Sequence, residues 1–169
     1  RGDLDFAQSL RHRVALLAGL TLADLEAAAR RITPMPGAAA LVSAMKASGA
    51  VTALVSGGFT IFAERVAAML GFDHVCANTL GVENGRLTGH VADPVLDAAA
   101  KRDRLLDLAA SADLDLSQVL AVGDGANDLA MLEAAGLGVA FRAKPAVRAA
   151  MQASPTGAVI DHAGLTAIL

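Results

Sequence analysis

The sequence has a single cysteine, Cys76, so it holds no pair of thiols that could form an internal disulfide. Chains without a disulfide framework are typical of reducing compartments, and we expect a cytoplasmic location. Neither sign of charge dominates the sequence, because the formal net charge of the 169 residues is only −3 at pH 7. Nucleic-acid binding needs a basic field that this balance lacks. We therefore expect no nucleic-acid partner, and any anionic ligand must be held by a local site.

Long apolar runs and a signal sequence are missing as well. Charged residues, glycine or proline interrupt every apolar stretch well before the ~18 residues that a membrane span requires, so we expect no membrane association. The first five residues, Arg1 to Asp5, hold no apolar signal core and no initiator methionine. Because they open on charges just before a helical pattern, we expect the sequence to be a fragment of a longer protein.

Hydrophobic residues make up 54% of the sequence, and they alternate between strand-like runs and helical patterns. Buried parallel strands read as short, β-branched apolar runs, and such runs occur at residues 51–55, 119–123, 138–141 and 159–160. Helical periodicity is found at residues 38–48, 59–70, 98–110 and 129–135. This alternation predicts an α/β fold, with a Rossmann-like parallel sheet and right-handed crossovers from about residue 38 onward. An Asn-Gly pair at positions 84 and 85 predicts a small hairpin near residues 75–92.

The first 36 residues carry a different pattern, which predicts a helical cap. Apolar residues at helical spacing predict one short helix within residues 4–17. A second helix is predicted after Thr21, which can act as its N-cap and form a capping box with Asp24. Two such helices are too small to bury their apolar faces alone and must pack on another part of the protein. Two prolines and a glycine in residues 33–37 predict a linker, so we expect a cap over residues 1–36 and a core over residues 37–169.

The stretch with the most chemical information follows the apolar run at residues 119–123 and reads Gly123-Asp124-Gly125-Ala126-Asn127-Asp128. In an open α/β sheet, ligands bind just beyond the carboxyl ends of the strands. Two carboxylates at such a place indicate a site for a hard cation, because Mg²⁺ binds one or two carboxylates together with substrate phosphate. The alternative is a polar loop whose Asp128 caps the helix that follows.

A second loop that could bind a ligand is Ser56-Gly57-Gly58, placed between a predicted strand and a predicted helix. Free backbone N–H groups, the positive end of the helix and the Ser56 hydroxyl could together bind a phosphate, although the turn could equally be structural. No Gly-Lys-Ser/Thr follows, which excludes a P-loop, and the third glycine of a dinucleotide fingerprint is missing. The G-x-S-x-G pattern of a serine nucleophile is also absent.

Two basic residues have positions from which they could neutralise an anion. Lys101 lies in the first turn of the helix that precedes the 119–123 strand, so its side chain could reach over the strand ends. Arg13 lies on the predicted cap, where it could pair bidentately with a carboxylate. For both residues the alternative is an ordinary solvated surface charge. The four histidines show no spacing typical of metal ligands.

Taken in order, Ser-Gly-Gly after one strand, a lysine, and Gly-Asp-x-x-x-Asp after a later strand resemble the motifs of the haloacid dehalogenase-like hydrolase superfamily. The likeness is strongest to its phosphoserine-hydrolysing members, and it extends to residues 4–14, 31–34 and 143–145. The resemblance implies a Mg²⁺-dependent hydrolysis of O-phospho-L-serine to L-serine and phosphate through an aspartyl-phosphate, the last step of serine biosynthesis. Such chemistry is physically reasonable, because a carboxylate nucleophile divides the hydrolysis into two easier steps.

The resemblance also implies roles for the residues of the acidic loop and for the lysine. Asp124 would bind the metal, and Asp128 would act in catalysis by supporting the metal site. Lys101 would bridge the phosphate and the nucleophile, so it would serve both binding and catalysis. These roles agree with the demand of phosphoryl transfer for positioning and charge neutralisation.

The remaining implied roles concern the substrate. Ser56 and Gly57 would hold the phosphoryl group, and Asn127 would hydrogen-bond in the substrate site. Arg13, with Phe6 beside it, would extend from the cap to bind the substrate carboxylate. The implied partner is a small-molecule substrate. Assembly into a homo-oligomer is also left open as an alternative to a monomer.

The sequence departs from the family at the nucleophile. The family's nucleophile lies in an Asp-x-Asp-x-Thr motif, and none occurs in the sequence; one partial match, Asp3-Leu4-Asp5-Phe6-Ala7, lacks the threonine. We expect the nucleophile upstream of Arg1, so the residues given are expected to be inactive on their own. Two alternatives stay open, a related phosphatase that acts on another small phosphometabolite and a non-catalytic module that binds phosphoserine or serine.

Overall fold

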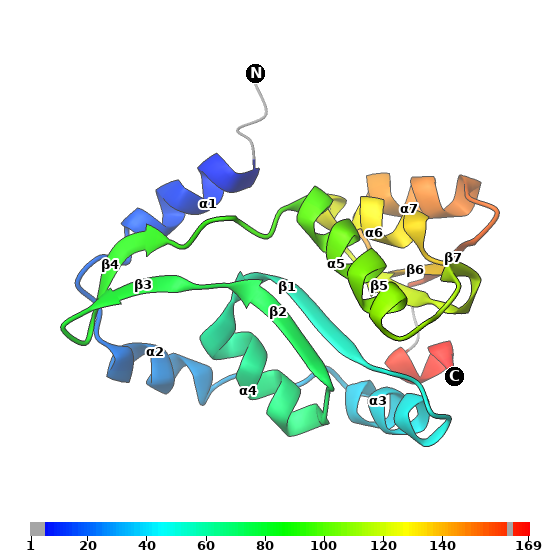
Figure 1. The fold of residues 1–169 in the computed structure, drawn as a ribbon, viewed down its shortest axis with the longest axis horizontal. Helices are drawn as coiled ribbons and strands as arrows, with labels where there is room; N and C mark the ends of the chain where they lie inside the picture. Colours follow the sequence, from blue (N-terminus) through cyan, green and yellow to red (C-terminus); the bar gives the residue numbers. More distant parts are fainter. Residues whose placement is uncertain (1–5, 162–163) are drawn as a thin grey trace. The chain divides into compact units, whose positions relative to one another are not determined.

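The structure, a computed structural model, describes residues 6–161 and 164–169 (Figure 1). The chain divides into two compact units. The first contains the described residues up to Met35 together with Met45–Asp97, and the second contains Pro36–Ala44 together with the described residues from Ala98 onward. The change of unit between Met35 and Pro36 falls within the predicted linker at residues 33–37. The division into a cap at residues 1–36 and a core at residues 37–169 stays a prediction.

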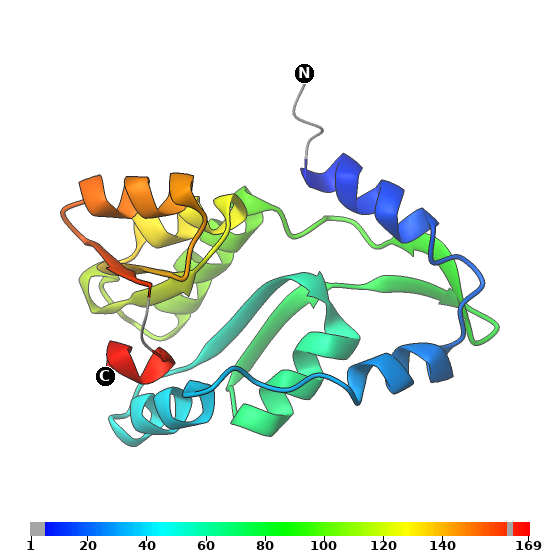
Figure 2. The ribbon, with the colours of Figure 1, turned by 180° about the vertical axis from the view of Figure 1, so that it is seen from behind.

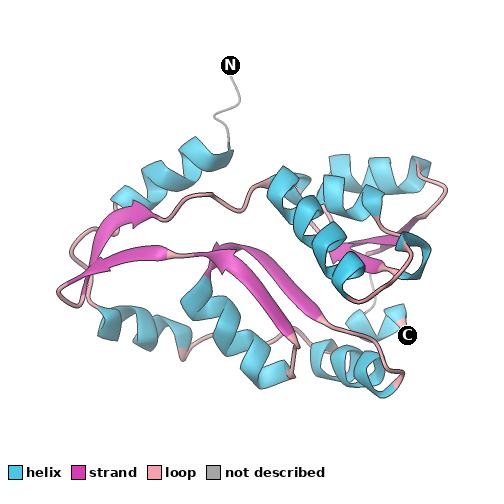
Figure 3. Ribbon diagram, in the orientation of Figure 1, coloured by secondary structure: helices cyan, strands magenta, loops and turns pink. Residues whose placement is uncertain are grey.

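The first unit combines a parallel strand pair with an antiparallel hairpin. It is built from α1 (Phe6–Ala15), α2 (Leu22–Ala29), α4 (Thr60–Leu70), β1 (Ala53–Phe59), β2 (His74–Asn78), β3 (Leu80–Glu83) and β4 (Arg86–Val91). β1 and β2 are parallel, and α4 packs against both strands (Figure 3). β3 and β4 are antiparallel, and Asn84 and Gly85 between them have positive φ angles of 52° and 74°. A two-residue hairpin turn requires such angles, so the predicted hairpin is confirmed.

The two helices of the predicted cap are present in the first unit. α1 packs against β4 and buries Leu10 and Val14 in a cluster with Val91 and Val95. Residues 4 and 5 of the predicted first helix lie outside the described residues. α2 begins after Thr21, whose hydroxyl accepts a hydrogen bond from the backbone N–H of residue 24, while the side chain of that residue accepts one from the Thr21 N–H. The predicted capping box is therefore confirmed.

β1 differs from the prediction at its carboxyl end. The sequence predicts a strand that stops at residue 55, a turn at Ser56-Gly57-Gly58 and a helix from Phe59. In the structure the strand continues to Phe59, and α4 begins at Thr60. The register against β2 shifts between Ser56 and Phe59, so the strand continues with an irregularity. Ser56 and Phe59 pair with β2 on either side of the two glycines, and this pairing keeps the backbone extended across them. The local sequence pattern does not reveal a constraint from another strand.

The second unit contains a parallel three-stranded sheet in the order β5-β6-β7. Its elements are α5 (Ala98–Ser111), β5 (Leu120–Gly123), α6 (Leu129–Ala134), β6 (Leu137–Phe141), α7 (Pro145–Ala153), β7 (Gly157–Ile160) and the short 3₁₀ turns η1 (Leu116–Gln118), η2 (Ala126–Asp128) and η3 (Leu165–Ile168). α3 (Ala38–Ala47) begins in this unit and ends in the first. α6 and α7 lie side by side next to the strands (Figure 2). In this unit the strand predictions agree with the structure to within two residues. The sequence pattern did not predict α7, although Pro145 at its first position is a recognised start signal.

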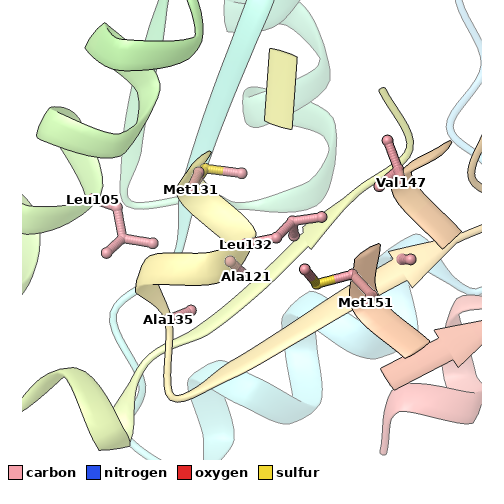
Figure 4. Close-up of a cluster of buried hydrophobic side chains, with 8 residues drawn as sticks. Leu105, Ala121, Met131, Leu132, Ala135, Val147 and Met151 are labelled. Atoms are coloured by element: carbon pink, nitrogen blue, oxygen red, sulfur yellow. The ribbon is translucent and has the colours of Figure 1, made fainter. Parts of the chain in front are cut away.

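The core of the second unit lies between this sheet and its helices (Figure 4). Leu132, Val147 and Met151 are fully buried at its centre. α7 approaches β7 so closely that a Cβ on Gly157 would overlap the carbonyl of Met151. Glycine is therefore required at position 157 for α7 to pack on the sheet. Among the described residues, no helix has the length and apolar character needed to cross a membrane.

Candidate active site

The centre of the acidic loop is a buried ion pair between Lys101 and Asp128. Lys101 lies in the first turns of α5, and Asp128 ends η2, directly before α6. The Lys101 Nζ donates to Asp128 Oδ1 at 2.7 Å, and the two side chains are only 5% and 9% exposed. The alternative of a solvated surface lysine is therefore wrong for Lys101, because α5 packs against η2 and α6 and covers its side chain.

Asp128 also fixes the backbone of the loop that precedes it. Its second oxygen, Oδ2, accepts hydrogen bonds from the N–H groups of Asp124 at 3.2 Å and Gly125 at 3.0 Å. The side chain makes no capping bond to α6, so the alternative of a simple helix cap does not describe it. A Cβ on Gly123 would lie 2.5 Å from the Asp128 Cβ, which explains why a glycine stands there. One carboxylate thus holds both the loop and the lysine.

Asp124 is the carboxylate of the loop that faces solvent. Its side chain is exposed, while its carbonyl accepts a hydrogen bond of 3.0 Å from the N–H of Lys144, at the end of the β6–α7 connection. The backbone of the loop is therefore held on two sides, by the Asp128 carboxylate and by the N–H of Lys144. Asn127 is half-buried, and its Oδ1 lies over Gly125, where an added Cβ would come within 2.6 Å. The backbone is restrained and the Asp124 carboxylate stays available to a ligand.

The donor set of this loop fits a hard divalent cation of the magnesium type. Within residues 6–161 and 164–169, no three His, Cys, Asp or Glu side chains gather into a complete metal cage. Asp128 is engaged by Lys101, so the loop offers one free carboxylate, that of Asp124. Mg²⁺ keeps several waters and binds through one or two carboxylates plus substrate phosphate, so it does not need a cage made of protein alone.

The Ser56 segment belongs to the first unit and is ordered by its own hydrogen bonds. The hydroxyl oxygen of Ser56 accepts a bond of 3.1 Å from the N–H of Gly58. The carbonyl of Gly57 accepts one of 3.0 Å from the side chain of Asn78. Ser56 and Gly57 are both half-buried at the carboxyl end of β1. The predicted position at a strand end is right, although the backbone there is extended instead of turned.

Phe6 and Arg13 lie on α1, in the same unit as Ser56. Phe6 packs against the apolar cluster of α1 and β4, and so does Phe59 at the end of β1. The start of α1 and the end of the strand that carries Ser56 therefore share one apolar cluster. Arg13 is exposed, and its Nε donates to the Ser9 carbonyl one turn earlier at 3.3 Å.

The predicted site residues thus form two groups. Lys101, Asp124, Asn127 and Asp128 come together in the second unit, and Phe6, Arg13, Ser56 and Gly57 belong to the first. Sequence reasoning missed Asn78, which is 3% exposed and bonded to the Gly57 carbonyl. The available signal was a lone amide at the end of an apolar strand-like run, where a buried polar side chain must find partners.

Residues 1–133 match the family model of haloacid dehalogenase-like hydrolases, and the chain belongs to this family. The resemblance inferred from the three motifs is confirmed. The α/β fold with parallel strand pairing is confirmed as well, because solved structures of phosphoserine phosphatases share it over almost the whole chain.

Several curated relatives of this chain are phosphoserine phosphatases. Those of Streptomyces coelicolor and Idiomarina loihiensis are each 50% identical to this chain, over 89% and 88% of its length. A solved phospho-aspartyl intermediate analogue of phosphoserine phosphatase is 41% identical, with a TM-score of 0.89 over 98% of this chain and 77% of that one. A probable phosphoserine phosphatase from Vibrio cholerae gives the same identity and TM-score over 98% of this chain and 50% of its own. The chain spans 37% of the Streptomyces relative and 68% of the Idiomarina relative.

Proposed function

We propose that this protein is a cytoplasmic, Mg²⁺-dependent phosphoserine phosphatase, which hydrolyses O-phospho-L-serine to L-serine and phosphate in the last step of serine biosynthesis. The observation that carries the proposal is the buried Lys101–Asp128 pair beside the solvent-facing Asp124 carboxylate. Phosphoryl transfer requires a positioned cation that neutralises the phosphoryl group and a carboxylate that can bind the metal. The 50% identity to two phosphoserine phosphatases supports the choice of substrate.

In this proposal Lys101 and the acidic loop supply charge. The Lys101 ammonium neutralises a phosphoryl oxygen and the nucleophile. Asp128 accepts a hydrogen bond from this ammonium and so restricts the Lys101 side chain to one conformation. Asp124 is the residue that would hold Mg²⁺, and a bound Mg²⁺ would withdraw charge from the phosphoryl oxygens. Asn127 donates a hydrogen bond to the substrate from the same loop.

Ser56, Gly57 and Arg13 are the proposed donors to the phosphoryl group and to the substrate carboxylate. Ser56 offers its hydroxyl, and Gly57 its backbone N–H, to the phosphoryl oxygens. Arg13 pairs with the substrate carboxylate through its guanidinium, and Phe6 packs beside it. The covalent step needs an aspartate nucleophile that forms an aspartyl-phosphate. We propose that it lies upstream of Arg1, because residues 1–169 contain no Asp-x-Asp-x-Thr.

The test of the activity is phosphate release from phosphoserine by the complete natural protein, with and without Mg²⁺. A panel of small phosphomonoesters is run in parallel. We expect phosphoserine to be the best substrate and chelation of the metal to stop the reaction. A better turnover of another phosphometabolite would identify a related phosphatase instead. Binding of phosphoserine without phosphate release would identify a non-catalytic module.

The role of the cap residue gives a sharper test of the substrate. We predict that Arg13→Ala raises KM for phosphoserine by roughly tenfold or more, the loss expected for a charge-assisted pair, while KM for a small aryl phosphate stays unchanged. Steady-state kinetics on both substrates measures this. Arg11→Ala on the same helix is the matched control, because Arg11 pairs with Asp93 and has no proposed role at the site. An equal effect of Arg13→Ala on both substrates would show that the cap assignment is wrong.

A further inference from the structure

Asn78 has a buried side chain to which none of the roles above applies. It ends β2 and is 3% exposed. Its Nδ2 donates to the Gly57 carbonyl at 3.0 Å, and its Oδ1 accepts from the Leu96 N–H at 2.7 Å. The two ends of the amide therefore face one acceptor and one donor, which defines the orientation of the side chain. A buried amide satisfied by the backbone of two separate segments restrains both of them.

The bond to Gly57 falls where the strand pairing is irregular. The register of β1 against β2 shifts between Ser56 and Phe59, and Phe59 is the residue opposite Asn78. Backbone groups at such a shift lose regular ladder partners. The Asn78 amide supplies one of these partners from a side chain. It therefore holds the peptide group that joins Gly57 to Gly58.

That peptide group is held at its other end by Ser56. Its carbonyl accepts from Asn78, and its N–H, which belongs to Gly58, donates to the Ser56 hydroxyl oxygen at 3.1 Å. A hydroxyl that accepts this bond still has its own proton to donate. The orientation of the peptide thus decides where the Ser56 hydroxyl lies and leaves its proton for an anion.

We propose that Asn78 is a positioning residue for phosphate binding, which orients the Ser56 hydroxyl through the Gly57–Gly58 peptide. The inference rests on the proposed function in one respect, namely that Ser56 binds the phosphoryl group. Asn78 touches no substrate in this account. It acts through the backbone, so its effect must disappear when the Ser56 hydroxyl is removed.

The first test is Asn78→Asp in the complete protein. Aspartate keeps the acceptor for the Leu96 N–H but, as a carboxylate, turns a lone pair toward the Gly57 carbonyl. We expect KM for phosphoserine and the inhibition constant of inorganic phosphate to rise by roughly tenfold at neutral pH, while kcat changes less. Burial raises the pKa of a carboxyl group, and the protonated form can donate to the Gly57 carbonyl. The defect relative to wild type should therefore shrink as the pH is lowered.

Asn84→Asp is the matched control for this variant. It makes the same chemical change in the same unit, at the exposed turn between β3 and β4. We expect wild-type KM, phosphate inhibition and pH dependence from it. A pH-dependent recovery shared by both variants, or wild-type constants in Asn78→Asp, would overturn the proposal.

A double-mutant cycle covers the case in which the aspartate variant does not fold. Asn78→Ala should weaken phosphate inhibition by roughly tenfold with no recovery at low pH, because no titrating group is introduced. Ser56→Ala should weaken it as well, and the double variant should be no worse than Ser56→Ala alone. Additive losses would show that Asn78 does not act through Ser56 and would overturn the proposal.

The outcomes separate this inference from the proposed function. Hydrolysis of phosphoserine by the wild type with an additive cycle would leave the function intact and remove the role of Asn78. If the wild type binds inorganic phosphate without hydrolysis, the cycle is measured by calorimetry with phosphate, and non-additivity there supports the role of Asn78 alone. A wild type that neither hydrolyses phosphoserine nor binds phosphate would overturn both.

Discussion

Lys101 and Asp128 place two opposite charges in the interior of one unit, where removal from water costs each of them several kcal/mol in free energy. The cost is offset because the ammonium and both carboxylate oxygens find partners, among them the N–H groups of Asp124 and Gly125. A buried pair of this kind is weak as a source of stability. It is well suited to hold a cation in one place for an incoming anion.

The burial of this pair predicts how its two residues contribute to stability. Lys101→Met should lower the free energy of unfolding by about 3–5 kcal/mol, because it leaves the Asp128 carboxylate buried without its partner. Adding Asp128→Asn should restore much of the stability, since a neutral amide can still accept from the loop N–H groups, while turnover stays lost. Urea unfolding and phosphate release measure the two effects. A loss of under about 1 kcal/mol in the single variant would place the pair in solvent, contrary to its burial.

Asp124 has an exposed side chain, and its carbonyl accepts a structural hydrogen bond from the N–H of Lys144. Asp124→Asn should leave the unfolding transition within about 0.5 kcal/mol of wild type, as for other surface changes. If Asp124 holds the metal as proposed, activity should fall about 100-fold or more, because the variant would lose the metal that neutralises the phosphoryl charge. Calorimetric titration with Mg²⁺ and kinetic assays test this, with Asp103→Asn on the exposed face of α5 as the control. Retained Mg²⁺ affinity in Asp124→Asn would show that the metal ligand is a different residue.

At the scale of elements, one carboxylate ties the end of α3 to the start of β1 and to the turn before β2. Asp73 accepts hydrogen bonds from the Lys46 ammonium, from the Thr52 N–H at 2.9 Å and from the Thr52 hydroxyl at 2.8 Å. Lys46 also donates to the carbonyl of Gly71, at the end of α4. These bonds hold the pKa of Asp73 well below its ordinary value of 3.8, and the bond from Lys46 has the largest effect.

The direction of this pKa shift predicts how stability depends on pH. Because the native state holds the carboxylate charged more strongly than the unfolded chain does, the unfolded chain takes up the proton first as the pH falls. The contribution of Asp73 to stability is therefore complete above about pH 4 and is lost progressively below it. Asp73→Asn should lower stability at neutral pH and flatten its decline in acid, as measured by urea midpoints at a series of pH values. In the Lys46→Met background, Asp73→Asn should flatten the pH dependence of stability less than it does in wild type. An equal flattening in both backgrounds would contradict the role of Lys46.

At the scale of the whole molecule, ligand binding and folding are linked. Any ligand that binds only the native state raises its stability, by about 2.7 kcal/mol when its free concentration is 100 times Kd. The proposed function therefore predicts that Mg²⁺ with inorganic phosphate raises the melting temperature of the complete protein. Asp124→Asn should remove the Mg²⁺-dependent part of this rise, and Ser56→Ala should reduce the phosphate-dependent part. Melting curves at increasing ligand concentration test it, and equal rises in all three proteins would place the binding elsewhere.

Several features of this protein were determined by the sequence alone. The Thr21–Asp24 capping box and the Asn84-Gly85 turn depend on a few neighbouring residues, and both were predicted correctly. The alternation of strands and helices follows from the periodicity of apolar residues, which is also local. The motifs that define the family are short strings of residue types, so the sequence could reveal them without any tertiary contact.

Other features were decided only by the tertiary structure. Lys101 is separated from Asp128 by 27 positions, and only the packing of α5 on η2 and α6 removes it from water. β1 continues across Gly57 and Gly58 because β2 pairs with the residues on either side, Ser56 and Phe59, although the glycines locally favour a turn. Asn78 is held by two partners in other segments, the Gly57 carbonyl and the Leu96 N–H. Burial and strand pairing depend on segments far apart in the chain, so a local pattern can name the residues of a site but not the contacts that hold them.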